Sequence, residues 1–339
     1  MPPPFGGRTA SRAPAKPAQP IPVVACAVWG PSPANRSALE ARALLAAGVR
    51  ALDAAGLATA RQDAEWLLAA ELGVSRFVLY TDPPPISEGD ARRYAEALTR
   101  RAAHEPLQHL LGWEEFRGLR LRVAPAVLIP RPETELLVEW ALELLPPGAT
   151  VCDLGTGSGC IACAIAAVRP DVRVLAVERS AAARAVAAQN VAALGLGDRV
   201  IVLAGDLFAP LGSRRGAVDA IVANPPYIPT GAWPALPVEV RAWEPRAALD
   251  GGPDGMAVSR RIITGAPAVL APHGVLAMEI GEEQARPLAA TMRACGFVDV
   301  TTRRDLGGRE RYLAGVLDSS PTDPRRATGR SCVDRAELG

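Results

Sequence analysis

The chain has 339 residues, of which 49% are hydrophobic, and its formal net charge is +1. This length and hydrophobic content suit one large domain plus a smaller one, and they exclude a wholly disordered protein. The near-neutral charge argues against a surface that grips long nucleic acid by counterion release. No run approaches about 18 uncharged apolar residues, so we expect no membrane span and no membrane partner.

Both ends of the chain have compositions typical of disorder. Residues 1–36 are rich in proline, alanine and arginine, and the first acidic residue is Glu40. Such a segment cannot bury enough apolar surface to offset its ordering entropy, so we predict a disordered extension there. The polar segment 318–339 is predicted to be a disordered tail.

The next part of the chain has a helical pattern. Apolar residues recur at helical spacing over residues 39–56 and again over 64–72. Ser87 resembles the N-cap of a third helix over residues 91–103. We therefore predict a small all-α domain over residues 37–112.

A short linker is expected to follow. Residues 116–123 and 127–129 have the composition of two short strands, which predicts a β-hairpin linker over residues 113–132. Two prolines delay the next helix until Glu133, after which an apolar stripe continues to Leu144.

From Thr150 onward, apolar runs alternate with helical stretches. This order is typical of a parallel sheet with crossover helices, and it predicts an α/β, doubly wound, seven-stranded Rossmann-like domain over residues 133–317. Helices are predicted at 159–168, 181–194 and 283–295. Strands are predicted at 150–153, 173–178, 199–203, 218–223, 274–280, 297–303 and 310–317.

The six cysteines are scattered, and no secretory signal pattern precedes them. Free thiols in a reducing cytosol, and hence a cytoplasmic protein, are the natural interpretation. Cys160 and Cys163 form a CxxC pair, but no second pair or histidine cluster completes a zinc site, so we expect no metal. The cysteines are Cys26, Cys152, Cys160, Cys163, Cys295 and Cys332.

A glycine-rich loop follows the first strand of the predicted sheet. It reads Asp153-Leu-Gly-Thr-Gly-Ser-Gly159, and its glycines let the backbone turn sharply and approach a ligand. A dinucleotide fingerprint would place its third glycine at the position of Cys160. Asp153 would repel a pyrophosphate but suits a positive amino group. The loop therefore favours S-adenosylmethionine, which carries an ammonium, a sulfonium and no phosphate, over NAD.

Two further strand ends carry acids. Glu178 ends the second strand, where a carboxylate can accept hydrogen bonds from both hydroxyls of a ribose. Asp206 and Leu207 follow the third strand, where an acid beside an apolar face suits an adenine ring. A solvated glutamate at a strand end is the alternative interpretation of Glu178.

The fourth strand ends in Asn224-Pro-Pro-Tyr227. Prolines commonly end strands, but in a sheet of order 3-2-1-4-5 the first and fourth strands are neighbours, and ligands bind beyond their ends. A planar nitrogen could there donate its two hydrogens to the side-chain carbonyl of Asn224 and the backbone carbonyl of Pro225. Pro225 and Pro226 preorganise these acceptors, and Tyr227 can stack on the target group.

These motifs together resemble those of class I methyltransferases that modify planar nitrogens, and in particular the peptide chain release factor glutamine methyltransferases, the HemK/PrmC family. The resemblance covers about residues 38–317. Besides the two motifs above, it rests on five segments. They are Glu105–Gly112, Val127–Glu135, Glu244–Gly252, Met278–Gly281 and Arg304–Arg309.

The resemblance implies methyl transfer from S-adenosylmethionine to the side-chain amide nitrogen of the glutamine in the Gly-Gly-Gln motif of class I release factors, which promotes translation termination. It implies that the helical domain helps to dock the release factor. Asn224, Pro225, Pro226 and Tyr227 would hold the glutamine and form the catalytic group. The donor would be bound by Asp153, Gly155, Thr156, Gly157, Ser158, Gly159, Glu178, Asp206, Leu207 and Asn224.

This chain departs from the family pattern at two positions. Glu178 stands where an aspartate is more usual, which changes reach but not role. Leu207 stands where an aromatic residue is common, which weakens the predicted packing on adenine. The segment Arg131–Glu135 is expected to line the methionine end of the donor. A monomer without stable nucleic acid binding is expected.

Three other substrates are considered for the same chemistry. A DNA adenine methyltransferase would need a basic target-recognition region after the catalytic motifs, and the residues after Gly281 leave no room for one. An rRNA methyltransferase would need a basic stripe interleaved with aromatics, which the helical domain lacks. An enzyme that methylates a ribosomal-protein glutamine is disfavoured by the Ile129–Glu135 segment. A scaffold that only binds the donor would not need Asn224.

Overall fold

The computed structural model describes residues 33–212 and 216–318, which form two compact units, one up to Leu110 and one from Leu111. The predicted extension over 1–36 lies outside the described residues except for 33–36, which belong to the first helix. Cys26, Cys332 and the predicted tail beyond residue 318 also lie outside them. None of the described helices is both long and apolar enough to cross a membrane.

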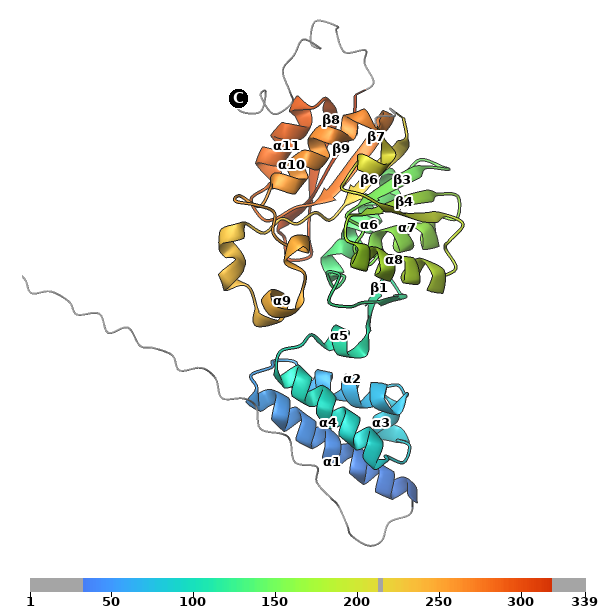
Figure 1. Ribbon diagram of the computed structural model, residues 1–339, viewed down its shortest axis with the longest axis vertical. Helices are drawn as coiled ribbons and strands as arrows, with labels where there is room; N and C mark the ends of the chain where they lie inside the picture. Colours follow the sequence, from blue (N-terminus) through green and yellow to red (C-terminus); the bar gives the residue numbers. More distant parts are fainter. Residues whose placement is uncertain (1–32, 213–215, 319–339) are drawn as a thin grey trace, which may run out of the picture. The chain divides into compact units, whose positions relative to one another are not determined.

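The first unit is helical (Figure 1). Ser87 and Asp90 form a reciprocal capping box at the start of its last long helix, which confirms the predicted cap, and Gly73 ends the second helix in the left-handed conformation. Its helices are α1 (Pro33–Ala54), α2 (Ala60–Leu72), α3 (Val78–Thr81) and α4 (Glu88–Ala102), and the short α5 (Leu107–Leu111) follows them.

A buried ion pair joins two helices of this unit. Nε of Arg101 on α4 lies 2.8 Å from Oδ2 of Asp63 on α2, and the two residues are 4% and 3% exposed. The hydroxyl of Thr59 also donates to Asp63, at 2.8 Å. Because a buried charge is costly unless it is paired and hydrogen-bonded, these contacts fix how α2 and α4 pack.

The predicted hairpin is present, but its strands are misplaced in the sequence-based prediction. The strands are β1 (Trp113–Phe116) and β2 (Leu119–Arg122), and residues 127–129 are not a strand. The turn is Arg117-Gly118, with φ of 49° and 73°, as a two-residue hairpin turn of type I′ requires. The prediction failed because it placed both residues inside a strand, where an arginine gives no sign of positive φ.

In the part of the chain that the structure describes, seven strands form one sheet of order β5-β4-β3-β6-β7-β9-β8. β9 pairs antiparallel with both β7 and β8, and the other pairs are parallel. The predicted doubly wound order is thus confirmed. The strands are β3 (Thr150–Leu154), β4 (Arg173–Glu178), β5 (Val200–Ala204), β6 (Val218–Ala223), β7 (Leu270–Glu279), β8 (Phe297–Arg304) and β9 (Glu310–Leu317).

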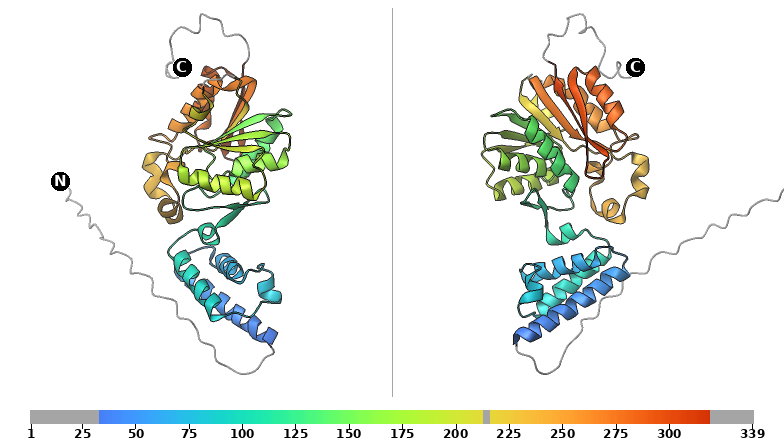
Figure 2. Two further views of the ribbon diagram at one scale, coloured as in Figure 1. Left: turned by 45° about the vertical axis from the view of Figure 1, so that its right-hand side comes forward. Right: turned by 180° about the vertical axis from the view of Figure 1, so that it is seen from behind.

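Helices cover both faces of this sheet (Figure 2). Val151 of β3 packs in the cluster with α6 and α7, and its neighbour Cys152 packs in the cluster with α10 and α11, because successive side chains of a strand point to opposite faces. The α-helices are α6 (Pro132–Leu144), α7 (Cys160–Val168), α8 (Ala181–Ala193), α9 (Val238–Trp243), α10 (Ala257–Gly265) and α11 (Ala285–Ala294). The 3₁₀ helices are η1 (Ala209–Leu211), η2 (Thr230–Ala235), η3 (Arg246–Ala248) and η4 (Ala266–Ala268).

The cysteines of this unit are free thiols. Cys163 is buried on α7, and burial raises the pKa of its thiol to about 12, so it stays neutral. Among the described residues, no group of histidine, cysteine, aspartate and glutamate could hold a metal ion.

Candidate active site

The register of the sheet brings the predicted motifs to one edge. Leu154, at the end of β3, pairs with Ala223 of β6 on one side and with Val177 of β4 on the other. Paired residues of parallel strands lie at the same level along the sheet. The glycine loop, which starts at Gly155, therefore begins between Asn224 and Glu178.

The glycine loop has the backbone that its sequence predicts. Gly155, Gly157 and Gly159 have φ of 72°, 55° and 83°, in the left-handed region where a side chain would be strained. The N–H groups of Gly155 and Thr156 donate to the carbonyl of Val177 at 2.9 and 3.0 Å. These bonds hold the loop against the end of β4.

Asp153 is fully buried behind this loop. Its Oδ2 accepts hydrogen bonds from the hydroxyl of Thr156 and from the N–H of Ala162, but its Oδ1 has no hydrogen-bond partner among the described residues. Burial raises the pKa of Asp153 to about 7, against the lowering effect of these two bonds. A carboxylate oxygen that has lone pairs but no hydrogen-bond donor beside it suits a cationic ligand rather than an anionic one.

Glu178 lies beside the loop, as predicted. Its Oε2 accepts from the N–H of Gly157 at 3.2 Å, and its Oε1 accepts from the N–H of Ser180 at 2.8 Å. A carboxylate has about four lone-pair positions, so two remain for further donors. The carboxylate is thus held in one orientation by the backbone and can still bind the hydroxyls of a ribose.

The segment after β5 has contacts that the sequence did not indicate. The carboxylate of Asp206 lies 2.6 Å from Nη2 of Arg261 on α10, and both side chains are about half exposed. Leu207 has φ of 49° and packs, half-buried, against the core beside α10. Asp206 therefore already has a cationic partner, and its predicted contact with adenine remains a prediction.

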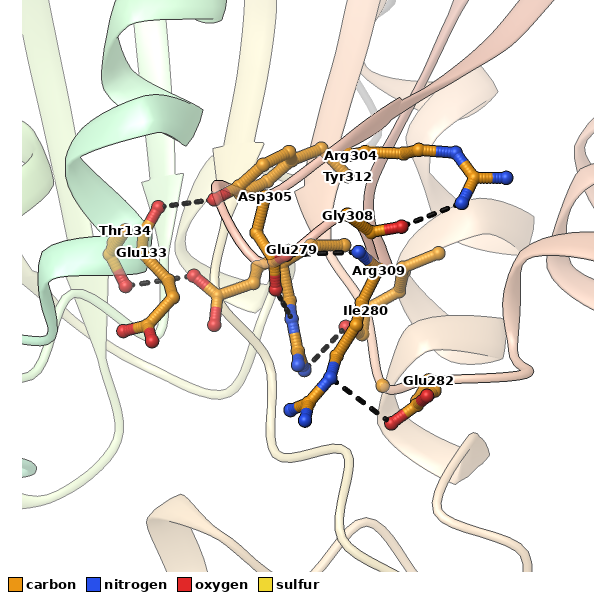
Figure 3. A network of polar contacts seen from close by, with 12 residues as sticks. Glu133, Thr134, Glu279, Ile280, Glu282, Arg304, Asp305, Gly308, Arg309 and Tyr312 are labelled. Carbon is orange, nitrogen blue, oxygen red and sulfur yellow. Dashed lines mark hydrogen bonds and ion pairs between the residues drawn. The ribbon is translucent and has the colours of Figure 1, made fainter.

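The amide of Asn224 is tied to α6. Its Nδ2 donates to Oγ1 of Thr134 at 3.0 Å. The hydroxyl of Thr134 donates in turn to Oε2 of Glu279 at 2.8 Å, as Figure 3 shows. Thr134 and Glu279 are 2% and 1% exposed. Burial raises the pKa of Glu279 to about 7, while the bond from Thr134 and the charge of Arg311 lower it.

Two glycines let a loop after η3 support the Asn-Pro-Pro-Tyr segment. A Cβ on Gly251 would lie 2.6 Å from the carbonyl oxygen of Pro226, and one on Gly255 would lie 2.4 Å from that of Tyr227. Nε2 of Gln284 donates to the same Tyr227 carbonyl at 2.9 Å. The segment is thus held by close backbone packing as well as by its prolines.

The ring of Tyr227 is flanked by charge. Cζ of Arg311 lies 5.7 Å from the ring centroid, within range of a cation–π contact. Burial, followed by the nearby charge of Glu279, raises the pKa of the tyrosine, so the phenol is neutral at physiological pH. Nε of Arg311 lies 3.4 Å from Oδ2 of Asp305, which ties the ring to the β8–β9 turn (Figure 3).

Two segments on which the family resemblance rests meet in the structure. Arg131 forms an ion pair with Glu244, whose Oε2 also accepts from the N–H of Ile129 at 3.1 Å. The carboxylate of Glu135 accepts from the N–H of Arg117 in the hairpin at 2.8 Å. These contacts anchor the start of α6, and the predicted role of this segment at the donor remains a prediction.

Glu279, Gln284 and Arg311 were given no role from the sequence, and Thr134 was included only as part of the Arg131–Glu135 segment expected at the donor. Glu279 had the clearest signal, because it is a carboxylate at the carboxyl end of a buried strand, the same pattern that identified Glu178. The signal was missed because β7 lies two strands away from the glycine loop in the sheet order. The contact of Thr134 with Glu279 had no signal in the sequence, since it spans 145 positions.

Comparisons with known proteins identify the family of this chain. Residues 43–112 match the family model of the PrmC N-terminal domain, and residues 132–233 match that of the methyltransferase small domain. The release factor glutamine methyltransferase of Geobacter sulfurreducens is 45% identical over 263 residues, which are 77% of this chain and 91% of that protein. That of Moorella thermoacetica is 45% identical over 278 residues, 80% of this chain and 97% of that protein. The chain belongs to the family of release factor glutamine methyltransferases.

Proposed function

We propose that the protein transfers a methyl group from S-adenosylmethionine to the side-chain amide nitrogen of the glutamine in the Gly-Gly-Gln motif of class I release factors. The main support is the pairing of Leu154 with Ala223, which sets the glycine loop and the Asn-Pro-Pro-Tyr segment side by side. Membership of the family supports a glutamine amide, among the possible planar nitrogens, as the group that is methylated.

The donor side of the site fits S-adenosylmethionine. The unpartnered oxygen of buried Asp153 suits a cation, and the held carboxylate of Glu178 has lone pairs left for a ribose. The residues proposed to hold the donor are those predicted from the sequence: Asp153, Gly155, Thr156, Gly157, Ser158, Gly159, Glu178, Asp206, Leu207 and Asn224. When bound, the sulfonium supplies a methyl group whose bond to sulfur breaks as the target nitrogen bonds to it.

The acceptor side makes the amide nitrogen reactive. An amide nitrogen is a poor nucleophile because its lone pair is delocalised into the carbonyl. Oδ1 of Asn224 and the carbonyl of Pro225 would accept the two amide hydrogens, which orients the lone pair and stabilises positive charge that develops on nitrogen. The prolines fix these acceptors before the substrate arrives, and Tyr227 stacks on the planar group. The protonated product is acidic and loses its extra proton to solvent.

The helical unit helps to dock the release factor, and the protein acts as a monomer in the cytoplasm without holding nucleic acid stably. The match of residues 43–112 to the PrmC N-terminal domain supports a family-specific role for that unit. Light scattering of the protein alone tests the monomeric state, and a gel-shift assay with ribosomal RNA tests the absence of stable nucleic acid binding. A stable dimer or a retained RNA would contradict them.

A substrate competition tests the main proposal. The protein is incubated with methyl-labelled donor and, in parallel, with purified release factor, large ribosomal subunit or duplex DNA. We expect label on the release factor, and a mass gain of one methyl on the peptide that contains Gly-Gly-Gln. Label on a ribosomal protein, on ribosomal RNA or on DNA, with none on the release factor, would overturn the assignment. A release factor with the glutamine changed to alanine is the matched control.

A further inference from the structure

A line of hydrogen-bonded side chains runs from a buried carboxylate to the amide of Asn224. Glu279 accepts from Thr134, which accepts from Asn224, and the three residues come from β7, from α6 and from the segment after β6. Figure 3 shows Thr134 and Glu279 approaching each other from two different elements. Because both are almost fully buried, water does not compete for the bond between them.

The chemistry of the groups gives this line a direction. An ionised carboxylate can only accept hydrogen bonds, so the single hydroxyl proton of Thr134 points at Glu279. The hydroxyl then faces Asn224 with a lone pair, and only the NH₂ half of the amide can bond to it. Oδ1 of Asn224 is thereby turned to the opposite side of the amide.

This direction matters because the two orientations of an asparagine amide have nearly the same shape. Packing alone would scarcely distinguish them. A flipped Asn224 would turn its NH₂ group toward the NH₂ group of a glutamine, so that two donors would face each other. The acceptor that stabilises charge on the target nitrogen would then be lost.

We propose that Thr134 and Glu279 are positioning residues that hold Oδ1 of Asn224 toward the target nitrogen. This inference rests on the proposed function, since it concerns the acceptor for a hydrogen of the glutamine amide. Neither residue touches the reacting atoms. Their effect passes through the orientation of a single amide group.

The line depends on the charge of Glu279. A protonated Glu279 can donate to Thr134, which releases the hydroxyl proton to turn toward Asn224. The groups that face Glu279 are Thr134 and Glu133 of α6, Tyr227, and Arg311 and Tyr312 of β9. Burial raises the pKa of both tyrosines, and Arg311 is cationic throughout, so Glu279 is the group among these partners whose raised pKa falls near neutrality.

The decisive variants are Thr134→Ser, Thr134→Val and Glu279→Gln, assayed as the full chain on purified release factor at saturating donor. Thr134→Ser keeps the hydroxyl, and we expect kcat within about threefold of wild type. Thr134→Val keeps the shape of the side chain but loses the hydroxyl. In Glu279→Gln the new amide can donate to the hydroxyl of Thr134, which can then donate to Asn224 instead of accepting from it. For both we expect kcat to fall by about 10²-fold, the scale of losing one preorganised polar contact, with the donor KM within a few-fold.

A purely structural role for Thr134 predicts the reverse order, with valine tolerated and serine harmful, and that result would overturn the inference. The matched control is Thr302→Val, because Thr302 also donates to a glutamate, Glu310, at 3.0 Å, but has no link to Asn224. Thr302→Val should leave kcat unchanged. The wild-type kcat should rise with pH through about 7, and Glu279→Gln should lose that rise. A rise that persists in Glu279→Gln would assign it to another group, such as Asp153, and contradict the inference.

Nuclear magnetic resonance can detect the hydrogen bond between Asn224 and Thr134 without any methyl transfer. The side-chain NH₂ signals of Asn224, assigned by their loss in Asn224→Ala, should be protected from hydrogen exchange in wild type and in Thr134→Ser, and exposed in Thr134→Val. Equal protection in all three would contradict the inference. If the wild type methylated no release factor, the proposed function would fail, but this measurement would still decide how the amide is held.

Discussion

Glu178 and Glu279 both end a strand of the same sheet, yet their surroundings differ. Glu178 is half-buried and is held by two backbone N–H groups, whereas Glu279 is 1% exposed and is held by a threonine hydroxyl. The contrast extends to the neighbouring strands. Glycines at positive φ follow β3, which lies beside the strand that ends in Glu178, whereas two prolines follow β6, which lies beside the strand that ends in Glu279.

The difference corresponds to what the proposed function requires of each side of the site. On the donor side a small molecule enters and leaves in every cycle, and backbone groups that remain near solvent can bind it and release it. On the acceptor side the orientation of one amide must be right before the substrate arrives. Buried side-chain contacts are suited to that task, because breaking one leaves a polar group unsatisfied. Four predictions test this division.

The largest expected effect is that of Asn224→Ala. Removal of the side-chain acceptor should cost about 2.7–4 kcal/mol of transition-state stabilisation, or roughly 10²–10³-fold in kcat. Donor binding, measured by calorimetry, should stay within a few-fold of wild type, because the glycine loop and Glu178, which supply most of the proposed donor contacts, are unchanged. Normal turnover by Asn224→Ala would show that the side chain takes no part in the reaction.

Glu178→Ala should have the opposite signature. Hydrogen bonds to a charged group contribute about 1.5–3 kcal/mol, so we expect the dissociation constant of the donor to rise by about 10–100-fold. At saturating donor, kcat should remain within a few-fold of wild type. Glu178→Gln keeps one acceptor oxygen, so its dissociation constant for the donor should lie between those of wild type and Glu178→Ala. An unchanged donor affinity would mean that Glu178 only holds the glycine loop.

The packing beneath Tyr227 can be tested with two alanines at matched backbone conformations. Gly255 and Gly308 have φ of 77° and 79°, but a Cβ on Gly308 would meet nothing within 4 Å, whereas one on Gly255 would meet the carbonyl of Tyr227. Each alanine should cost about 1–2 kcal/mol for the left-handed backbone. Gly255→Ala should lose about 1–3 kcal/mol more from overpacking, measured by denaturant unfolding, together with activity. Equal losses for the two variants would mean that the segment after β6 can move aside.

The smallest expected effect per pH unit is a pH dependence of stability, which is spread over the range from about 4.5 to 7. Because the pKa of Glu279 is about 7 in the folded protein and about 4.3 for an unperturbed glutamate, unfolding between these values releases a proton. Raising the pH from about 4.5 to 7 should therefore lower the free energy of unfolding, by no more than about 1.4 kcal/mol per pH unit from this group. Glu279→Gln should have a flatter profile than wild type in chemical denaturation. Buried Asp153 should contribute a similar slope that Glu279→Gln leaves in place.

The sheet and the row of strand ends could be predicted from the sequence. Buried parallel strands are short apolar runs, and each connecting helix supplies its own period, so β3, β4 and β6 were recognised to within a residue or two. Once the order of strands is assumed, it follows that Gly155, Glu178 and Asn224 lie close together. The site residues that could be found were those at the ends of these strands.

Contacts between distant segments could not be predicted. Thr134 lies in the first turn of α6, where a threonine has no functional signature, and its partners are found only when α6 packs beside β7. The ion pair of Asp206 with Arg261 likewise joins positions 55 apart. The turn at Arg117 was missed for a different reason, since its left-handed conformation is set by the twist of the hairpin rather than by the residue.

The pairing of Leu154 with Ala223 fixes the position of Asn224 relative to the glycine loop along the strand direction. One residue of a strand spans about 3.3 Å, which is about the distance from which two reacting atoms approach each other. A single residue inserted into or deleted from β6 would therefore shift Asn224 by a whole reaction distance relative to the glycine loop. The number of residues in these two strands is therefore part of the chemistry.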